Sequence, residues 1–141
     1  MVPSIEAMEN EIAAMSEGLT VEQKIVTMDN YIEKRAEIDG AVDGLEEMQK
    51  EFKQGFSYKC KRWSIKAKCR DGYEMDILCT APWAIAQNKN SGAYIYAHGG
   101  GGFAGSAQQS DLGMSFVALN LNCVVFNVEY RLSPEHKCPV G

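Results

Sequence analysis

Residues 93–106 read AYIYAHGGGGFAGS, a short apolar run that ends in a histidine and four consecutive glycines. Glycines bury no side chain and lose the most backbone entropy on ordering, so packing does not explain four of them in a row. Without a Cβ atom, glycine adopts positive φ and can present its backbone N–H group directly to a ligand atom. The stretch therefore predicts a strand that ends in a cradle for an anion, either a phosphate or the oxyanion of a reacting carbonyl group.

The sequence on both sides of the glycines predicts an α/β arrangement. Residues 93–97 and 123–128 are short apolar runs typical of buried strands, and residues 109–121 between them carry apolar side chains at helical spacing. Strand, loop, helix and strand in this order make a βαβ unit. Such units have parallel strands, and helices cover both faces of their sheets.

Two alternating runs precede this unit. Residues 63–69 and 73–79 place apolar side chains at every second position, which is typical of strands. The Asp-Gly pair at 71–72 predicts a tight antiparallel hairpin between them. The apolar residues before position 61 have the opposite phase, so either a bulge falls near residues 61–62 or the first strand begins only there. A hairpin that leads into a βαβ unit predicts a mixed, mostly parallel sheet.

The N-terminal residues 4–54 predict three acidic helices, which end at Gly18, Gly40 and Gly55. Each helix has a single apolar stripe, so we expect each to lie on an apolar surface of the rest of the protein. In the second helix the stripe consists of Val21, Ile25, Met28 and Ile32.

The composition is that of one ordinary globular domain. Of the 141 residues 45% are hydrophobic and 23% charged, and no run approaches the roughly 18 apolar residues of a membrane span. The net charge of −5 argues against nucleic acid as the main partner. The five cysteines include no Cys-x-x-Cys pair and the N-terminus lacks a signal-peptide pattern, so we expect reduced thiols and a cytoplasmic location.

Two interpretations of the glycine stretch compete. Gly100, Gly102 and Gly105 match the fingerprint of dinucleotide-binding folds, and Glu129 stands at the end of the next strand, where a ribose-binding carboxylate belongs. That interpretation gives His98 no role, and Glu129 follows Gly105 by 24 residues where about 20 is expected. A nucleoside-triphosphate loop is excluded, because no Gly-Lys-Ser/Thr follows the glycines.

The other interpretation uses more of the residues. Residues 98–106 (HGGGGFAGS), followed by residues 128–136 (VEYRLSPEH), closely resemble the hormone-sensitive-lipase branch of the α/β-hydrolases. In that family a His-Gly-Gly-Gly loop after the third strand supplies N–H donors to an oxyanion hole, and a Tyr-Arg-Leu-Ala-Pro-Glu segment follows the fourth strand. The resemblance implies the N-terminal half of an α/β-hydrolase fold. Residues 1–55 would form a helical cap segment and residues 56–141 a partial core with strands 1 to 4.

The same resemblance implies roles for the loop residues. Gly100 and Gly101 look like the N–H donors of the oxyanion hole, with His98, Gly99 and Gly102 as support for the loop. His98 could be read as a general base, but the resemblance favours a loop residue. The family usually has a large aromatic residue where Gly102 stands, which predicts less preorganised donors.

The segment after the last strand has its own implied roles. Arg131 and Glu135 look like a structural ion pair that braces this segment. His136 and Cys138 lack partners at ligand spacing, so we predict no metal site, and we predict no cofactor.

The sequence contains no Gly-x-Ser-x-Gly nucleophile elbow. Its nearest approach includes Ser115, which falls inside a predicted helix, where a serine hydroxyl faces solvent or bonds back to the preceding turn. No Ser-His-Asp triad can be assembled, so we expect an incomplete chain that is inactive alone.

The function that the resemblance implies is Ser-dependent hydrolysis of small-molecule carboxylic esters. The alternatives are a non-catalytic ligand-binding protein on the same fold and, third, an NAD(P)-binding enzyme. In the family the strand at 93–97 pairs with a later strand, so we expect an open edge at residues 94–96 that permits self-association.

Overall fold

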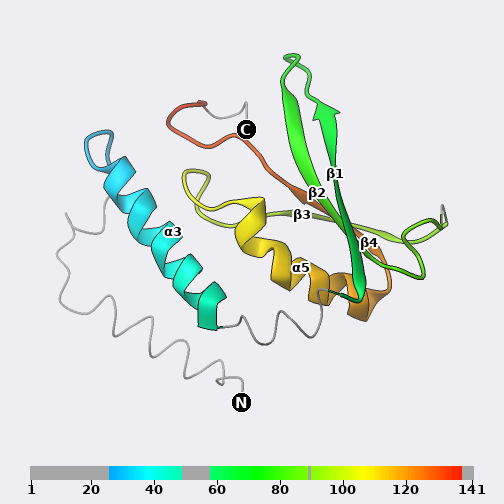
Figure 1. Ribbon diagram of the computed structural model, residues 1–141. Helices are drawn as coiled ribbons and strands as arrows, with labels where there is room; N and C mark the ends of the chain where they lie inside the picture. Colours follow the sequence, from blue (N-terminus) through cyan, green and yellow to red (C-terminus); the bar gives the residue numbers. More distant parts are fainter. Residues whose placement is uncertain (1–25, 49–57, 89, 138–141) are drawn as a thin grey trace.

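The computed structural model describes residues 26–48, 58–88 and 90–137, which contain two helices and four strands (Figure 1). In chain order these are α3 (Tyr31–Met48), β1 (Cys60–Lys68), β2 (Glu74–Pro82), β3 (Ala93–Ala97), α5 (Ala107–Leu121) and β4 (Val124–Val128). The predicted order of a hairpin followed by a βαβ unit is confirmed. The first predicted helix, the start of the second with Val21 and Ile25, and the end of the third lie outside the described residues.

The four strands form one mixed sheet in the order β1-β2-β4-β3. β2 pairs antiparallel with both β1 and β4, whereas β3 and β4 are parallel. Ala97 at the end of β3 pairs with Val128 at the end of β4. The glycine stretch and the segment after β4 therefore leave the sheet side by side.

The hairpin of β1 and β2 is confirmed, with a wider loop than an Asp-Gly turn requires. The strands pair without interruption from Cys60 opposite Pro82 to Lys68 opposite Glu74, so the first strand begins at Cys60 and contains no bulge. The N–H group of Cys69 donates to the carbonyl of Tyr73 at 2.7 Å and closes the loop.

Helix α5 covers one face of the sheet. Its first turn is capped by Ser106, whose hydroxyl accepts a hydrogen bond from the N–H group of Gln109 at 3.2 Å. Its Met114 and Ala118 form a buried cluster with Cys123 and Val125. The cluster fixes the helix over β4, and this places the N-terminus of α5 beside the glycine stretch.

The opposite face of the sheet is apolar. A row of paired residues crosses all four strands on this face and consists of Trp63, Cys79, Phe126 and Ile95. Cys79 is buried, but Ile95 on the edge strand β3 is 75% exposed. Among the described elements α5 packs on the sheet, and α3 contacts α5. The expected helices on both faces are therefore not found within the described ranges.

Helix α3 differs from its prediction. We expected a helix end at Gly40, but α3 runs unbroken from Tyr31 to Met48 through Gly40 and Gly44. Met28 and Ile32, expected in a buried stripe, are 71% and 69% exposed. The described contacts of α3 with the glycine stretch come instead from the polar side chains of Arg35 and Asp39. These contacts outweigh the loss of about 1 kcal/mol in helix stability that a glycine inside a helix causes.

Gly40 offers a stability prediction. A Cβ at this position would meet nothing within 4 Å, so Gly40→Ala is expected to stabilise the protein by about 0.5–1 kcal/mol through the lower entropy of the unfolded chain. Thermal unfolding followed by circular dichroism measures the change. Gly72→Ala is the control, because Gly72 also has open space but a φ of 89°, and this variant is expected to lose stability. Equal effects at both positions would contradict the prediction.

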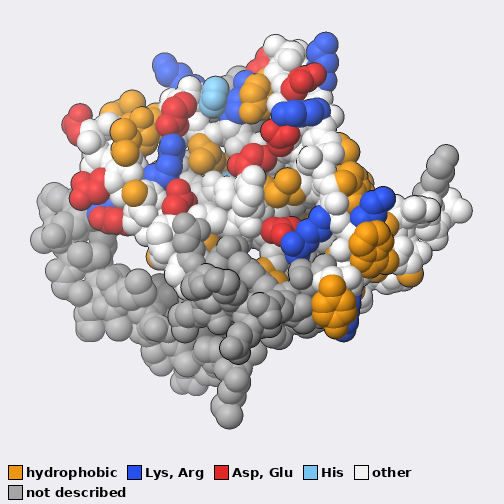
Figure 2. Space-filling view, viewed as in Figure 1, with side chains coloured by type: hydrophobic (Ala, Val, Ile, Leu, Met, Phe, Trp, Pro, Cys, Tyr) orange, Lys and Arg blue, Asp and Glu red, His pale blue; other side chains and the backbone are white. Residues whose placement is uncertain are grey.

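The surface view shows basic and acidic side chains interspersed on the face in Figure 2, without a large region of one sign. The basic residues of β1 follow this pattern, since Lys66 pairs with Asp76 at 2.8 Å. Neither described helix combines the length and the apolar character that crossing a membrane requires.

Candidate functional site

The glycine loop, residues 99–105, joins β3 to α5 and needs glycine at defined positions. Gly100, Gly101, Gly102 and Gly105 have φ values of 117°, 63°, 76° and 88°. A Cβ at Gly100 would collide with the backbone of Ala104, and one at Gly105 would lie 2.7 Å from the carbonyl oxygen of Gly99. Gly99 is different, because a Cβ there would meet nothing within 4 Å. The left-handed backbone and the close approaches explain why the stretch contains so many glycines.

In the first part of this loop, residues 99–102, the hydrogen bonds use carbonyl groups. The N–H groups of Phe103 and Ala104 both donate to Gly100 O at 3.1 Å, and Ser133 N donates to Gly102 O at 2.8 Å. In the hydrogen bonds of the described residues, no N–H group of residues 99–102 serves as a donor. The loop thus holds its carbonyl oxygens fixed and keeps adjacent N–H groups available.

His98 lies under the loop. Its side chain is buried, its Nδ1 donates to Gly99 O at 2.8 Å, and its ring stacks on Tyr130 with centroids 4.2 Å apart. Tyr130 also donates its hydroxyl to His98 O at 2.7 Å. Burial raises the pKa of Tyr130, so its phenol stays protonated as this donor. Both the ring and the backbone of His98 are thereby engaged in holding the loop.

Glu129, the carboxylate of the dinucleotide interpretation, has a structural partner. Its Oε2 accepts a hydrogen bond from Ala107 N at 2.8 Å, at the first residue of α5. A carboxylate is favoured at a helix N-terminus because the free N–H groups there carry partial positive charge. Its Oε1 lies 3.9 Å from His98 Nε2. Glu129 therefore joins α5 to the region of His98, and this use removes the main support for the dinucleotide interpretation.

The predicted ion pair between Arg131 and Glu135 is wrong. Arg131 Nη2 contacts Asp71 Oδ2 at 2.7 Å, and its guanidinium lies 4.4 Å from the ring centre of Tyr73. The hydrogen bond from Arg131 lowers the pKa of Asp71. Arg131 and Glu135 each pair instead with a residue distant in the chain. Arg131 thereby connects the segment after β4 to the loop of the β1–β2 hairpin.

Glu135 pairs with Arg35 of α3 through two hydrogen bonds of 2.8 Å. This contact lowers the pKa of Glu135 to about 2, chiefly through the hydrogen bonds from Arg35. Arg35 also donates from Nε to Phe103 O at 2.6 Å and from Nη2 to Ser133 O at 2.7 Å. Asp39, one turn further along α3, accepts from Gly105 N at 2.9 Å. Sequence reasoning missed Arg35 and Asp39, because nothing near them in the chain marks them.

Ser115 is buried in α5 and bonds back to the preceding turn, as expected for a serine inside a helix. Its hydroxyl donates to Asp111 O at 2.9 Å and accepts from Arg62 Nη2 at 2.8 Å. Burial raises the pKa values of the thiols of Cys60, Cys79 and Cys123, which disfavours their nucleophilic thiolate forms.

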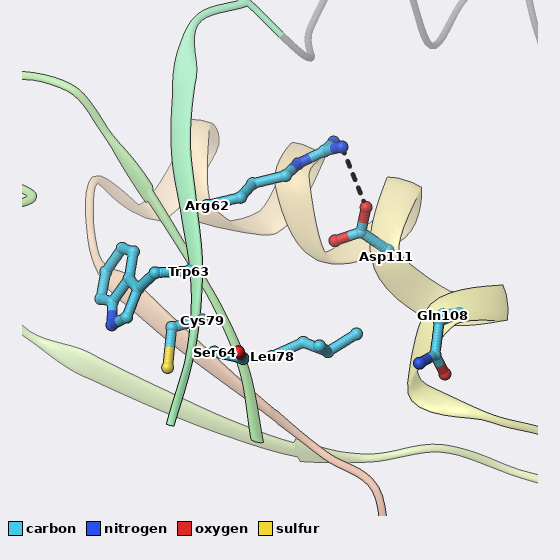
Figure 3. Close-up of a pocket in the computed structure, with 7 residues that line it drawn as sticks. All are labelled: Arg62, Trp63, Ser64, Leu78, Cys79, Gln108 and Asp111. Carbon is cyan, nitrogen blue, oxygen red and sulfur yellow. Dashed lines mark ion pairs between the residues drawn. The ribbon is translucent and has the colours of Figure 1, made fainter. Parts of the chain in front are cut away.

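An open pocket of about 330 Å³ is lined by residues of the hairpin and of α5 (Figure 3). Arg62 reaches from β1 across this pocket to Asp111 of α5 at 3.1 Å. The other lining residues are Trp63, Ser64, Leu78, Cys79 and Gln108. Its charged groups are already paired with each other, so we place the candidate site at the glycine loop, where polar groups are available.

Comparisons with known proteins bear on the fold. A family model described as alpha/beta hydrolase fold matches residues 94–141. An arylesterase of Saccharolobus solfataricus is 33% identical over 77 residues, which cover 55% of this chain and 24% of the relative. Carboxylesterase NlhH of Mycobacterium tuberculosis is 33% identical over 72 residues, covering 50% of this chain and 23% of the relative.

A solved structure, that of a bacterial heroin esterase, resembles this chain in three dimensions. The TM-score is 0.68 at 27% identity, and the match covers 93% of this chain and 38% of that one. This chain spans about a quarter of the length of the two curated relatives. It therefore carries part of an α/β-hydrolase fold.

Proposed function

We propose that the protein hydrolyses small-molecule carboxylic esters by Ser-dependent acyl transfer, and that Gly100 and Gly101 supply its oxyanion hole. The arylesterase and carboxylesterase names of its relatives support the reaction class. The observation that carries the proposal is the difference between the carbonyl groups and the N–H groups of the glycine loop. The carbonyl groups of Gly99, Gly100 and Gly102 accept hydrogen bonds, whereas the N–H groups of residues 99–102 donate to no described residue.

The chemistry requires such a loop. When a serine oxygen attacks the ester carbonyl, the new C–O bond pushes the π electrons onto the carbonyl oxygen and creates an oxyanion. A general base takes the serine proton during the attack and gives it to the departing alkoxide, which leaves as the alcohol. Water then hydrolyses the remaining acyl-serine to the carboxylic acid and the free serine. Fixed N–H donors stabilise the oxyanion, and each is worth about 3–4 kcal/mol or 10²–10³ in rate. His98, Gly99 and Gly102 act as loop support in this proposal.

The nucleophile decides between this function and its alternative. The 141 residues contain no Gly-x-Ser-x-Gly sequence, so we expect the chain alone to show no turnover. The test is to read the coding sequence past the codon of Gly141 and to assay the product with a short p-nitrophenyl ester. We expect an elbow serine within a few tens of residues, and its replacement by alanine abolishes hydrolysis. A coding sequence without that serine would instead favour a non-catalytic ligand-binding protein.

A cytoplasmic location is part of the proposal. The cysteines of the described ranges, Cys60, Cys69, Cys79 and Cys123, are all free thiols, which suits a reducing compartment.

A further inference from the structure

One arginine of α3 contacts both segments that build the candidate site. Arg35 donates from Nε to Phe103 O in the glycine loop, and from Nη2 to Ser133 O in the segment after β4. Its Nη1 and Nη2 also bind the two carboxylate oxygens of Glu135 at 2.8 Å each. The two segments are themselves joined by the hydrogen bond from Ser133 N to Gly102 O. Arg35 thus joins the glycine loop and the segment after β4, which also bond directly to each other.

Asp39 holds the other end of the same loop. It lies one helical turn after Arg35, and its Oδ1 accepts from Gly105 N at 2.9 Å. The backbone carbonyl of Asp39 accepts from Gln109 Nε2 of α5 at 3.4 Å. Together, Arg35 and Asp39 fix the loop directly after its four consecutive glycines.

The geometry of the contact requires an arginine. Phe103 O, Ser133 O and the Glu135 carboxylate are bound by three different nitrogens of one planar guanidinium group. A lysine has a single nitrogen on a flexible stem and cannot reproduce this fork. The Tyr31 ring lies 5.4 Å from the guanidinium carbon and adds a contact on its face. The low pKa of Glu135 keeps the partner carboxylate ionised at neutral pH.

We infer that Arg35 is a positioning residue for the oxyanion hole: it fixes the carbonyl of Phe103, and thereby the direction of the N–H groups of Gly100 and Gly101. The physical link is short, since Phe103 N and Ala104 N both donate to Gly100 O. A shift of the Phe103 peptide therefore moves the turn that presents the donors. This inference rests on the proposed function, and it assigns helix α3 a part in that function.

A purely structural role for Arg35, as an anchor of α3 alone, predicts different behaviour. Loss of an anchor destabilises the fold as a whole, whereas loss of a positioning contact acts on the loop. A matched control lies next in sequence: Lys34 pairs with Glu37 at 2.8 Å on the same helix, and no described contact joins this pair to the glycine loop.

The first experiment measures amide hydrogen–deuterium exchange of the 141-residue chain by mass spectrometry at low protein concentration. In Arg35→Lys, we expect exchange of the hydrogen-bonded loop amides, those of Phe103, Ala104 and Gly105, to rise by about tenfold or more through local opening, while β2 and β4 keep their protection. Lys34→Ala should match the wild type throughout. Unchanged loop exchange in Arg35→Lys and Arg35→Ala, or an equal rise over β2, β4 and the loop in both, would overturn the inference.

The second experiment uses the ester-hydrolysing protein encoded by the extended reading frame. Arg35→Lys is expected to lower kcat by about 10²-fold with KM unchanged, because misplaced donors weaken binding of the transition state more than of the substrate. A rise in KM at constant kcat would overturn the positioning role. If the wild type shows no ester hydrolysis, the proposed function fails, and the exchange result alone then decides whether Arg35 fixes the loop.

Discussion

Gly100→Ala is expected to abolish most activity and to destabilise the protein. The φ of 117° at Gly100 is rarely adopted by residues with a side chain, and a Cβ there would overlap the Ala104 backbone, which cannot move aside cheaply. The strained backbone alone costs about 1–3 kcal/mol. Relief of the clash must shift the peptide that presents a proposed oxyanion donor, and loss of one donor lowers kcat by about 10²–10³. Urea unfolding of the chain and ester kinetics of the longer product measure the two effects.

Gly99→Ala is the matched control for this variant. Gly99 stands next in the same run, yet its φ lies outside the left-handed region and a Cβ would meet nothing within 4 Å. We expect its free energy of unfolding to stay within about 0.5 kcal/mol of the wild type. If both variants lose stability and activity equally, the argument from backbone conformation at Gly100 is wrong.

Ile95→Lys is expected to suppress self-association of the 141-residue chain. Ile95 is 75% exposed on β3, which ends the sheet in the order β1-β2-β4-β3, and the apolar row through Phe126 reaches the surface at this residue. An exposed apolar edge strand invites pairing with a second chain, and an inserted lysine opposes it by the cost of burying its charge. Sedimentation velocity over a concentration series should show concentration-dependent association in the wild type and mostly monomer in the variant.

Leu121→Lys controls for a general gain in solubility. Leu121 is 60% exposed at the end of α5 and belongs to the helix, not to the edge strand β3, so this variant should associate like the wild type. A wild-type chain that is monomeric, soluble and cooperative in thermal unfolding would refute the predicted association.

The parts of the fold with a local sequence signal were predictable. Alternation of apolar residues predicted β1 and β2, and the order of strand, glycines, helix and strand predicted the βαβ unit. The predicted helix end at Gly40 was wrong, because the low helix propensity of glycine is a local preference that contacts with distant residues can outweigh. The glycine loop could be recognised from its composition, but its hydrogen bonds could not.

The contacts of the site that the sequence did not predict are polar contacts between residues far apart in the chain. Arg131 and Glu135 are close in sequence, so a mutual ion pair was the simplest expectation, yet their partners are Asp71 and Arg35. The sequence around a charged residue carries no signal that identifies which residue of opposite charge it will contact. Arg131 reaches Asp71 because β4 pairs antiparallel with β2, and Glu135 reaches Arg35 because α3 lies against this part of the fold. Only the assembled structure establishes either arrangement.

The separation of Arg35 from its partners also has a consequence for how the protein folds. The hairpin contacts join residues close in the chain, whereas Arg35 meets Phe103, Ser133 and Glu135 across 68, 98 and 100 residues. Closing such long loops costs chain entropy that only a largely assembled sheet can offset. The loop geometry on which the proposed chemistry depends is therefore expected to be acquired among the last steps of folding, after the strands that carry it have paired.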